Sequence, residues 1–132
     1  MYWTRGKLTP EQVELVFRHL PLDLSFADEN DVLVFWNGAT YQSCDAHSIG
    51  CDVRDCHPEH SLATLEEILR AFKAGERDVA EGWEEEKGRF AVTRYHAVRG
   101  DDGDYKGILE LNIDATDLRA LEGERSLPGW ED

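Results

Sequence analysis

Two hydrophobic periods divide this chain into expected helices and strands. Near the N-terminus, Thr9 suits an N-cap, Pro10 the first helical position, and Gln12 the residue that completes a capping box. Apolar residues then recur at helical spacing until Pro21, which ends the helix. A second amphipathic helix is expected over residues 61–74. Its apolar stripe consists of Leu62, Leu65, Ile68, Leu69 and Phe72.

Five other segments alternate apolar and polar residues, or are rich in β-branched and aromatic residues, which favours strands. These segments are 22–27, 32–36, 79–84, 89–98 and 105–113. The last one carries Leu109, Leu111 and Ile113 on one face, and Ile108, Glu110 and Asn112 on the other. Clusters of turn-forming residues at 28–31 and 100–103 predict the connections. A final helix is expected over 117–125, with Leu118 and Leu121 on its apolar side.

The order of these elements predicts an α+β fold. Strands and helices do not alternate regularly, so a doubly wound parallel sheet is disfavoured. Strands joined by short turns instead favour a five-stranded antiparallel sheet with helices packed on one face. We therefore expect an N-terminal flanking helix in residues 1–21, a central domain in 22–116, and a C-terminal helix and tail in 117–132.

The net charge and the hydropathy of the chain argue against several classes of binding partner. The 132 residues suit one domain, with 28 acidic against 14 basic residues and a net charge of −14. Such a surface repels phosphate backbones and anionic lipids, so neither nucleic acid nor membrane is an expected partner. No apolar run approaches the roughly 20 residues of a spanning helix. The N-terminus lacks the apolar stretch of a signal peptide, and the expected location is the cytoplasm.

Three local motifs in this order resemble the PAS domain family. Residues 26–37, FADENDVLVFWN, are similar to the first PAS hairpin. The pairing of IG at 49–50 with HPE at 57–59 resembles the segment before the long PAS helix, and DAT at 114–116 resembles the motif that ends the last PAS strand. One departure is Asp31, which stands where PAS hairpins usually turn on glycine.

A narrower resemblance concerns the PAS domain at the C-terminal end of DUF438 proteins, which often carry a hemerythrin-like domain upstream. It depends on the strings DCHP at 55–58, GERDVAE at 75–81 and RALEGER at 119–125. The PAS resemblance implies a signalling domain that senses a small molecule or redox state, without catalytic activity. It also implies a homodimer formed through the terminal helices. The residues expected at that interface are Val13, Val16, Phe17, Leu20, Leu118 and Leu121.

PAS domains bind ligands between the sheet and the helices, and the apolar residues of the expected elements supply such a pocket. Ligand pockets are mainly apolar with a few polar groups. The alternative is a fully packed core without a cavity. The candidate pocket residues are Leu24, Phe26, Leu33, Phe35, Leu65, Leu69, Trp83, Tyr95, Leu109 and Leu111.

A cluster of thiols and imidazoles forms a second candidate site. Such groups are the preferred ligands of zinc, iron and iron–sulfur centres. The candidate ligands are Cys44, His47, Cys51, Cys56, His57 and His60. Three alternatives remain: buried thiols with solvated histidines, a redox switch that pairs Cys51 with Cys56, or haem held by His60 or His57.

Enzyme motifs are poor in this chain. It has no GxGxxG, phosphate-loop or HExxH pattern, and AHSIG at 46–50 lacks the strand and helix that a nucleophile elbow requires. A small α+β enzyme using Tyr95, His96 or Asp28 is the remaining catalytic alternative. We therefore expect no enzyme activity.

Overall fold

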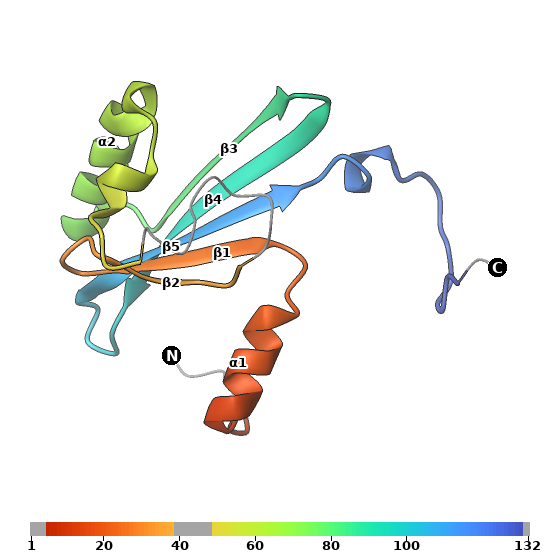
Figure 1. The fold of residues 1–132 in the computed structure, drawn as a ribbon, viewed down its shortest axis with the longest axis horizontal. Coiled ribbons are helices and arrows are strands. Elements are labelled where there is room, and N and C mark those ends of the chain that lie inside the picture. Colours follow the sequence, from red (N-terminus) through yellow and green to blue (C-terminus); the bar gives the residue numbers. More distant parts are fainter. Residues whose placement is uncertain (1–4, 39–48, 131–132) are drawn as a thin grey trace.

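The structure is a computed structural model that describes residues 5–38 and 49–130. Its centre is a five-stranded antiparallel sheet with the strand order β2-β1-β5-β4-β3 (Figure 1). The helical elements are α1 (Pro10–Arg18), α2 (Leu62–Lys73) and three short 3₁₀ turns, η2 (Val53–Cys56), η3 (Glu59–Ser61) and η4 (Leu118–Ala120). The strands are β1 (Asp23–Asp28), β2 (Leu33–Trp36), β3 (Val79–Glu86), β4 (Arg89–Arg99) and β5 (Tyr105–Asp114). The predicted α+β class and antiparallel sheet are confirmed.

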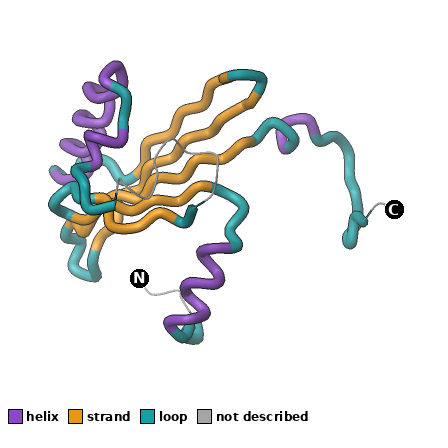
Figure 2. The backbone as a smooth tube through the Cα atoms, in the orientation of Figure 1, coloured by secondary structure: helices purple, strands orange, loops and turns teal. Residues whose placement is uncertain are grey.

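The strand register divides the sheet into two faces. In β1 and β5, Ala27 lies opposite Ile108 and Phe26 lies opposite Leu109. Because neighbouring residues of a strand point to opposite sides, these two pairs belong to different faces. Ala27 and Ile108 contact α2, so we call their side the inner face. The side of Phe26 and Leu109, which lies beside Val13 and Phe17 of α1, is the outer face. Figure 2 shows α1 at the lower edge of the sheet, well separated from α2.

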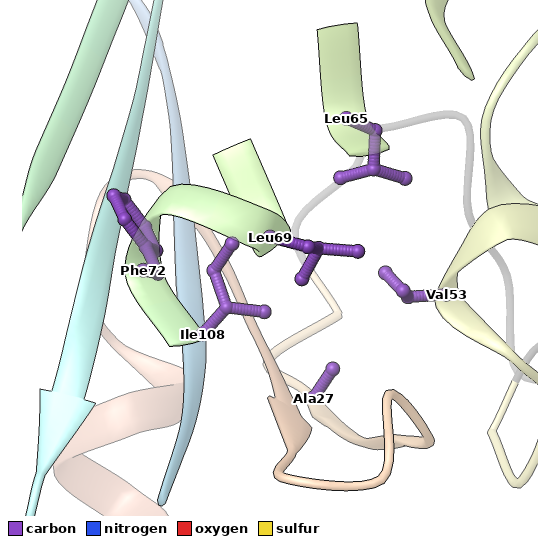
Figure 3. Close-up of a cluster of buried hydrophobic side chains, with 6 residues drawn as sticks. All are labelled: Ala27, Val53, Leu65, Leu69, Phe72 and Ile108. Atoms are coloured by element: carbon purple, nitrogen blue, oxygen red, sulfur yellow. The ribbon is translucent and has the colours of Figure 1, made fainter. Parts of the chain in front are cut away.

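The buried core lies between α2 and the inner face. Figure 3 shows how the helix side chains meet the small Ala27 and the larger Ile108 of the sheet. Leu69 and Phe72 are each 1% exposed, which makes α2 the best-buried helix among the described residues. The core cluster consists of Ala27, Val53, Leu65, Leu69, Phe72 and Ile108. The predicted apolar stripe of this helix therefore faces the sheet, as expected.

The turn between β1 and β2 connects the sheet to the helical layer. Asp31 has a φ of 65°, a backbone conformation that glycine and aspartate tolerate better than most residues. Its buried carboxylate accepts hydrogen bonds from Arg54 Nη1 at 3.1 Å and from Lys73 Nζ at 2.7 Å. Asp31 thus adopts the conformation for which PAS hairpins usually use glycine, and its side chain also ties the hairpin to η2 and α2.

The N-terminal helix follows its predicted start closely. Thr9 Oγ1 accepts from the backbone of Gln12, and the Gln12 side chain accepts from the backbone of Thr9, which completes the capping box. No residue of α1 is buried, and the helix contacts the sheet mainly through an edge-to-face pair of Phe17 and Phe35 whose ring centroids are 5.6 Å apart. Across residues 5–38 and 49–130, no helix is long and apolar enough to cross a membrane.

The expected C-terminal helix over 117–125 is wrong. Only the 3₁₀ turn Leu118–Ala120 forms; Leu121 is extended, and Gly123 has a φ of 66°. Leu118 and Leu121 are largely exposed. A helix this short needs burial of its apolar side to be stable, and the described part of the chain leaves Leu118 and Leu121 exposed.

Candidate functional site

The ten predicted pocket residues do not line one space, which corrects the sequence-based expectation. Leu33, Leu65, Leu69 and Tyr95 lie on the inner side, in or against the α2 core. Five others belong to the outer face by register, namely Leu24, Phe26, Phe35, Leu109 and Leu111. Trp83 also lies on the outer face, on the edge strand β3, and is 64% exposed. The pattern had grouped large apolar residues together, although both faces of this sheet carry them.

Four of these outer residues, Leu24, Phe26, Phe35 and Leu109, form a groove together with α1, which we call the outer groove. It has a volume of about 340 Å³ and an entirely apolar lining. Its lining residues are Val13, Phe17, Leu24, Phe26, Phe35, Val98 and Leu109. Two of the predicted dimer-interface residues, Val13 and Phe17, therefore lie in this groove.

The inner face carries a different kind of site, centred on His57. This residue follows η2, in the helical layer, and reaches across to the two central strands of the sheet. Its Nε2 atom lies 3.1 Å from the Tyr95 hydroxyl of β4 and 3.4 Å from a Glu110 carboxylate oxygen of β5. The His57 and Glu110 side chains are only 13% and 12% exposed. We call these three residues the inner triad.

Further polar side chains continue from the inner triad along the sheet. Asn112 Nδ2 donates to Glu110 at 2.8 Å, and Thr93 Oγ1 donates to Asn112 Oδ1 at 2.8 Å. At the next strand, the indole Nε1 of Trp36 donates to the buried Asp23 at 3.3 Å. Buried polar groups must be hydrogen-bonded to be tolerated, and this row provides such partners. The inner face therefore combines an apolar half under α2 with a polar half that begins at His57.

The Val53 carbonyl determines which nitrogen of the neutral His57 ring carries the hydrogen. Because a carbonyl can only accept, Nδ1 donates to it, at 2.9 Å. In the neutral ring Nε2 then accepts from Tyr95, whereas in the charged ring Nε2 donates to Glu110. Burial lowers the pKa of His57, but the hydrogen bond and negative charge of Glu110, with the Val53 carbonyl, outweigh it and raise the pKa above its usual value.

The predicted metal ligands do not converge in the part of the chain that the structure covers. Cys44 and His47 lie outside the described residues. Cys51 and His60 are exposed, and Cys56 is partly buried. Among residues 5–38 and 49–130, no three histidine, cysteine or acidic side chains are arranged to hold a metal ion. Metal, haem or redox chemistry at these six residues stays a prediction.

Sequence reasoning found His57 and Tyr95 separately but missed Glu110 as their partner. The alternation in β5 had put Glu110 and Asn112 on the face away from the helices. One signal pointed the other way: Ala27 and Ala97 share the face of Glu110, and small residues leave room for a packed helix.

The comparisons with known proteins agree on the fold. A family model described as a PAS domain matches residues 13–116. No curated protein matches the chain.

Several solved structures are similar. The crystal structure of a C-terminal domain from Streptococcus mutans is 26% identical, with a TM-score of 0.82 over 92% of this chain and 96% of that one. The PAS domain of a protein from Colwellia psychrerythraea is 17% identical, with a TM-score of 0.59 over 81% of this chain and 97% of that one. A sensory box sensor histidine kinase from Vibrio cholerae is 15% identical, with a TM-score of 0.57 over 79% and 89%. The last two show the fold alone.

Proposed function

Because this chain belongs to the PAS domain family, whose members are typically sensory signalling domains, we propose that it senses a small molecule at the inner face of its sheet, without catalysing a reaction. The proposal includes a cytoplasmic location, in keeping with the net charge of −14. The narrower relation to DUF438 proteins stays part of this proposal. Its support is the likeness to a solved domain from Streptococcus mutans that is itself described as C-terminal.

The inner triad is the observation that carries this proposal. His57 belongs to the helical layer, whereas Tyr95 and Glu110 belong to central strands, so their contacts join the two layers through polar atoms. Beneath the middle of α2 the layers meet through closely packed apolar side chains, which a ligand cannot enter without opening the core. A small molecule with hydrogen-bonding groups can instead replace one polar partner by another at modest cost.

Such a replacement would reach α2 by a short route. Only Pro58 separates His57 from η3, which leads into α2. A ligand that takes over the Tyr95 hydroxyl or the Glu110 carboxylate releases the His57 ring from the sheet, while Nδ1 still holds Val53. The segment between η2 and α2 then gains freedom to move relative to β4 and β5. This coupling requires no bond-making chemistry, which is why we propose a sensor.

A binding screen followed by mapping tests the proposal. A panel of metabolite-sized polar compounds is screened by thermal shift on the 132-residue chain, and each hit is mapped by amide chemical shifts. We expect at least one compound to perturb His57, Tyr95 and Glu110, to bind about tenfold more weakly to Tyr95→Phe, and to be recovered unchanged. The matched control is Tyr105→Phe, a half-buried tyrosine that packs against the α2 core.

Two results would overturn the proposal. One is that hits perturb residues of the outer groove and leave the inner triad unmoved. The other is chemical conversion of the bound compound, which would revive the catalytic alternative at Tyr95.

A further inference from the structure

The two edges of the sheet differ in how they are covered. At one edge, the Leu33 amide of β2 donates to the Cys51 carbonyl at 2.9 Å, and the Leu33 carbonyl accepts from the Gly50 amide at 2.7 Å. At the other edge lies β3, which pairs with β4 on one side only (Figure 1). Every residue of β3 except Ala80 is exposed. In the part of the chain that the structure describes, β3 is therefore an uncovered edge of eight residues.

The hydrogen-bond register shows which backbone groups of β3 point away from β4. The Ala97 amide donates to the Asp78 carbonyl at 2.9 Å, one position before the strand begins. Residues of an antiparallel pair alternate between bonding to the partner strand and pointing to the other side. The register of β3 and β4 has no bulge, so the alternation continues along the strand. The residues whose N–H and C=O groups point outward are Val79, Glu81, Trp83 and Glu85.

The outer side of this edge offers apolar contacts. Val79 and Trp83 both point to this side and are 53% and 64% exposed. The two glutamates that share the side are each paired with an arginine of the same chain, namely Glu81 with Arg94 and Glu85 with Arg119. An added strand would therefore gain most on this side by placing apolar side chains beside Val79 and Trp83.

The inner side of the same edge is acidic towards the end of the strand. Glu84 and Glu86 point to this side, and within residues 5–38 and 49–130 neither forms an ion pair. The neighbouring Arg89 and Asp114 lie 3.8 Å apart and balance each other. With Lys87 of the adjoining turn counted, this end of the strand still has a net negative charge. Basic side chains of an added strand would complement it.

The same charges argue against a second copy of this chain as the added strand. Pairing two β3 strands edge to edge would bring four glutamates from each copy to one junction. Like charges on neighbouring strands are destabilising, and charged residues on an edge commonly prevent such self-pairing. A partner with basic residues meets no such repulsion.

We propose that β3 binds an extended segment of another protein as an additional antiparallel strand. The outward N–H and C=O groups of β3 supply main-chain hydrogen bonds, which give affinity to this mode of peptide recognition. Specificity comes from the two sides of the strand: apolar residues of the segment lie beside Val79 and Trp83, and lysine or arginine residues lie beside Glu84 and Glu86. This recognition does not depend on ligand binding at the inner triad, which belongs to other elements.

A peptide titration of the 132-residue chain tests the proposal. The probe is the acetylated and amidated peptide Lys-Thr-Lys-Val-Thr-Thr-Thr-Val. When it runs antiparallel to β3, its lysines face the two inner glutamates and its valines face Trp83 and Val79. We expect hydrogen exchange to slow at the amides of the four outward residues, whereas the inward amides of Ala80, Gly82 and Glu84 are protected already in the free chain. The control peptide has glutamate in place of both lysines and should bind about tenfold more weakly or less.

A proline on the edge separates main-chain pairing from ordinary charge attraction. Glu81→Pro removes an outward N–H and no hydrogen bond to β4, so β3 keeps its pairing while peptide binding falls about tenfold. The matched control Glu81→Thr loses the same carboxylate and the same exposed pair with Arg94 but keeps the N–H. It should bind the peptide within about twofold of the parent chain.

A charge reversal keeps the test decisive even where the proline variant fails to fold. The double variant Glu84→Lys/Glu86→Lys changes two exposed side chains and should prefer the glutamate peptide over the lysine peptide. Equal binding of the two peptides by the parent chain overturns the proposal, as does peptide binding that perturbs Val13 and Phe17 instead of β3. Outward amides that are already protected in the free chain also overturn it, because the edge would then be occupied by this chain or by a second copy.

Discussion

Both faces of the sheet carry large apolar side chains, but the two faces use them differently. On the inner face, α2 buries Leu65, Leu69 and Phe72 almost completely. On the outer face, α1 has no buried residue and leaves an open apolar groove. The inner face therefore supplies the packed core, whereas the outer face keeps an open apolar surface.

The polar residues of the two faces support the same division. The inner face places Glu110 and His57 where water scarcely reaches, so their hydrogen bonds are sensitive to any incoming group. The charged pair Glu81–Arg94 lies on the outer side of β3 and β4 and is largely solvent-exposed. Exposed pairs of this kind contribute little to stability. This contrast is why we place the proposed ligand recognition at the inner face.

The largest expected loss of stability comes from removing a core side chain that packs on the inner face. Leu69→Ala removes a side chain that is 1% exposed and leaves a cavity against Ile108, so it should lower the free energy of unfolding by about 2–5 kcal/mol. The matched change on the other helix, Val16→Ala, alters a side chain that is 47% exposed and should cost less than about 0.5 kcal/mol. Urea denaturation measures both. Equal losses of unfolding free energy in the two variants would contradict the division into a packed inner face and an open outer face.

A second change tests the close backbone contact between β5 and β1 at Gly107. Gly107 has a φ of 152°, and a Cβ there would lie 2.3 Å from the Ala27 carbonyl oxygen and 2.6 Å from the Phe26 ring. Gly107→Ala should therefore destabilise the chain by about 1–3 kcal/mol and disturb the edge of β1. Gly82→Ala is the control, because a Cβ at Gly82 meets nothing within 4 Å. Thermal unfolding of the two variants compares them directly, and a neutral Gly107→Ala would show that β1 can shift.

The smallest expected effect is a pH dependence of stability that comes from His57 and Glu110. The pKa of His57 is raised in the folded chain, so its contribution to stability is complete below the unfolded value of about 6.5 and is lost as pH rises through the folded value. Glu110→Gln removes the negative charge and should lower this pKa. The stability difference between the parent and the variant should then be about 1 kcal/mol or less, and should shrink from pH 6 towards pH 8.

Proton NMR of the His57 ring, together with melting curves between pH 6 and pH 8, measures this effect. The control Glu84→Gln removes a charge from an exposed position of β3. A His57 pKa that is the same in the parent and in Glu110→Gln would mean that the two side chains do not interact in solution.

The sequence by itself determined most of the elements and their bounds, apart from the expected helix over 117–125, because these depend on local chemistry. Thr9, Pro10 and Gln12 start α1 as predicted, the stripe of α2 repeats at 3.6 residues, and Gly75 with its φ of 75° ends that helix. Alternation in β5 also identified correctly which residues share a face.

Only the tertiary structure decided which face of the sheet is covered by which helix. Period-two alternation separates Ile108 from Leu109 but assigns neither to α2, since both sides are apolar enough to be buried. That choice depends on the complementary sizes of Ala27, Ile108 and the α2 side chains, which meet only after the chain has folded. The same long-range packing brings His57 to Glu110, 53 positions later in the numbering, and leaves Leu118 and Leu121 exposed, so that no helix forms over 117–125.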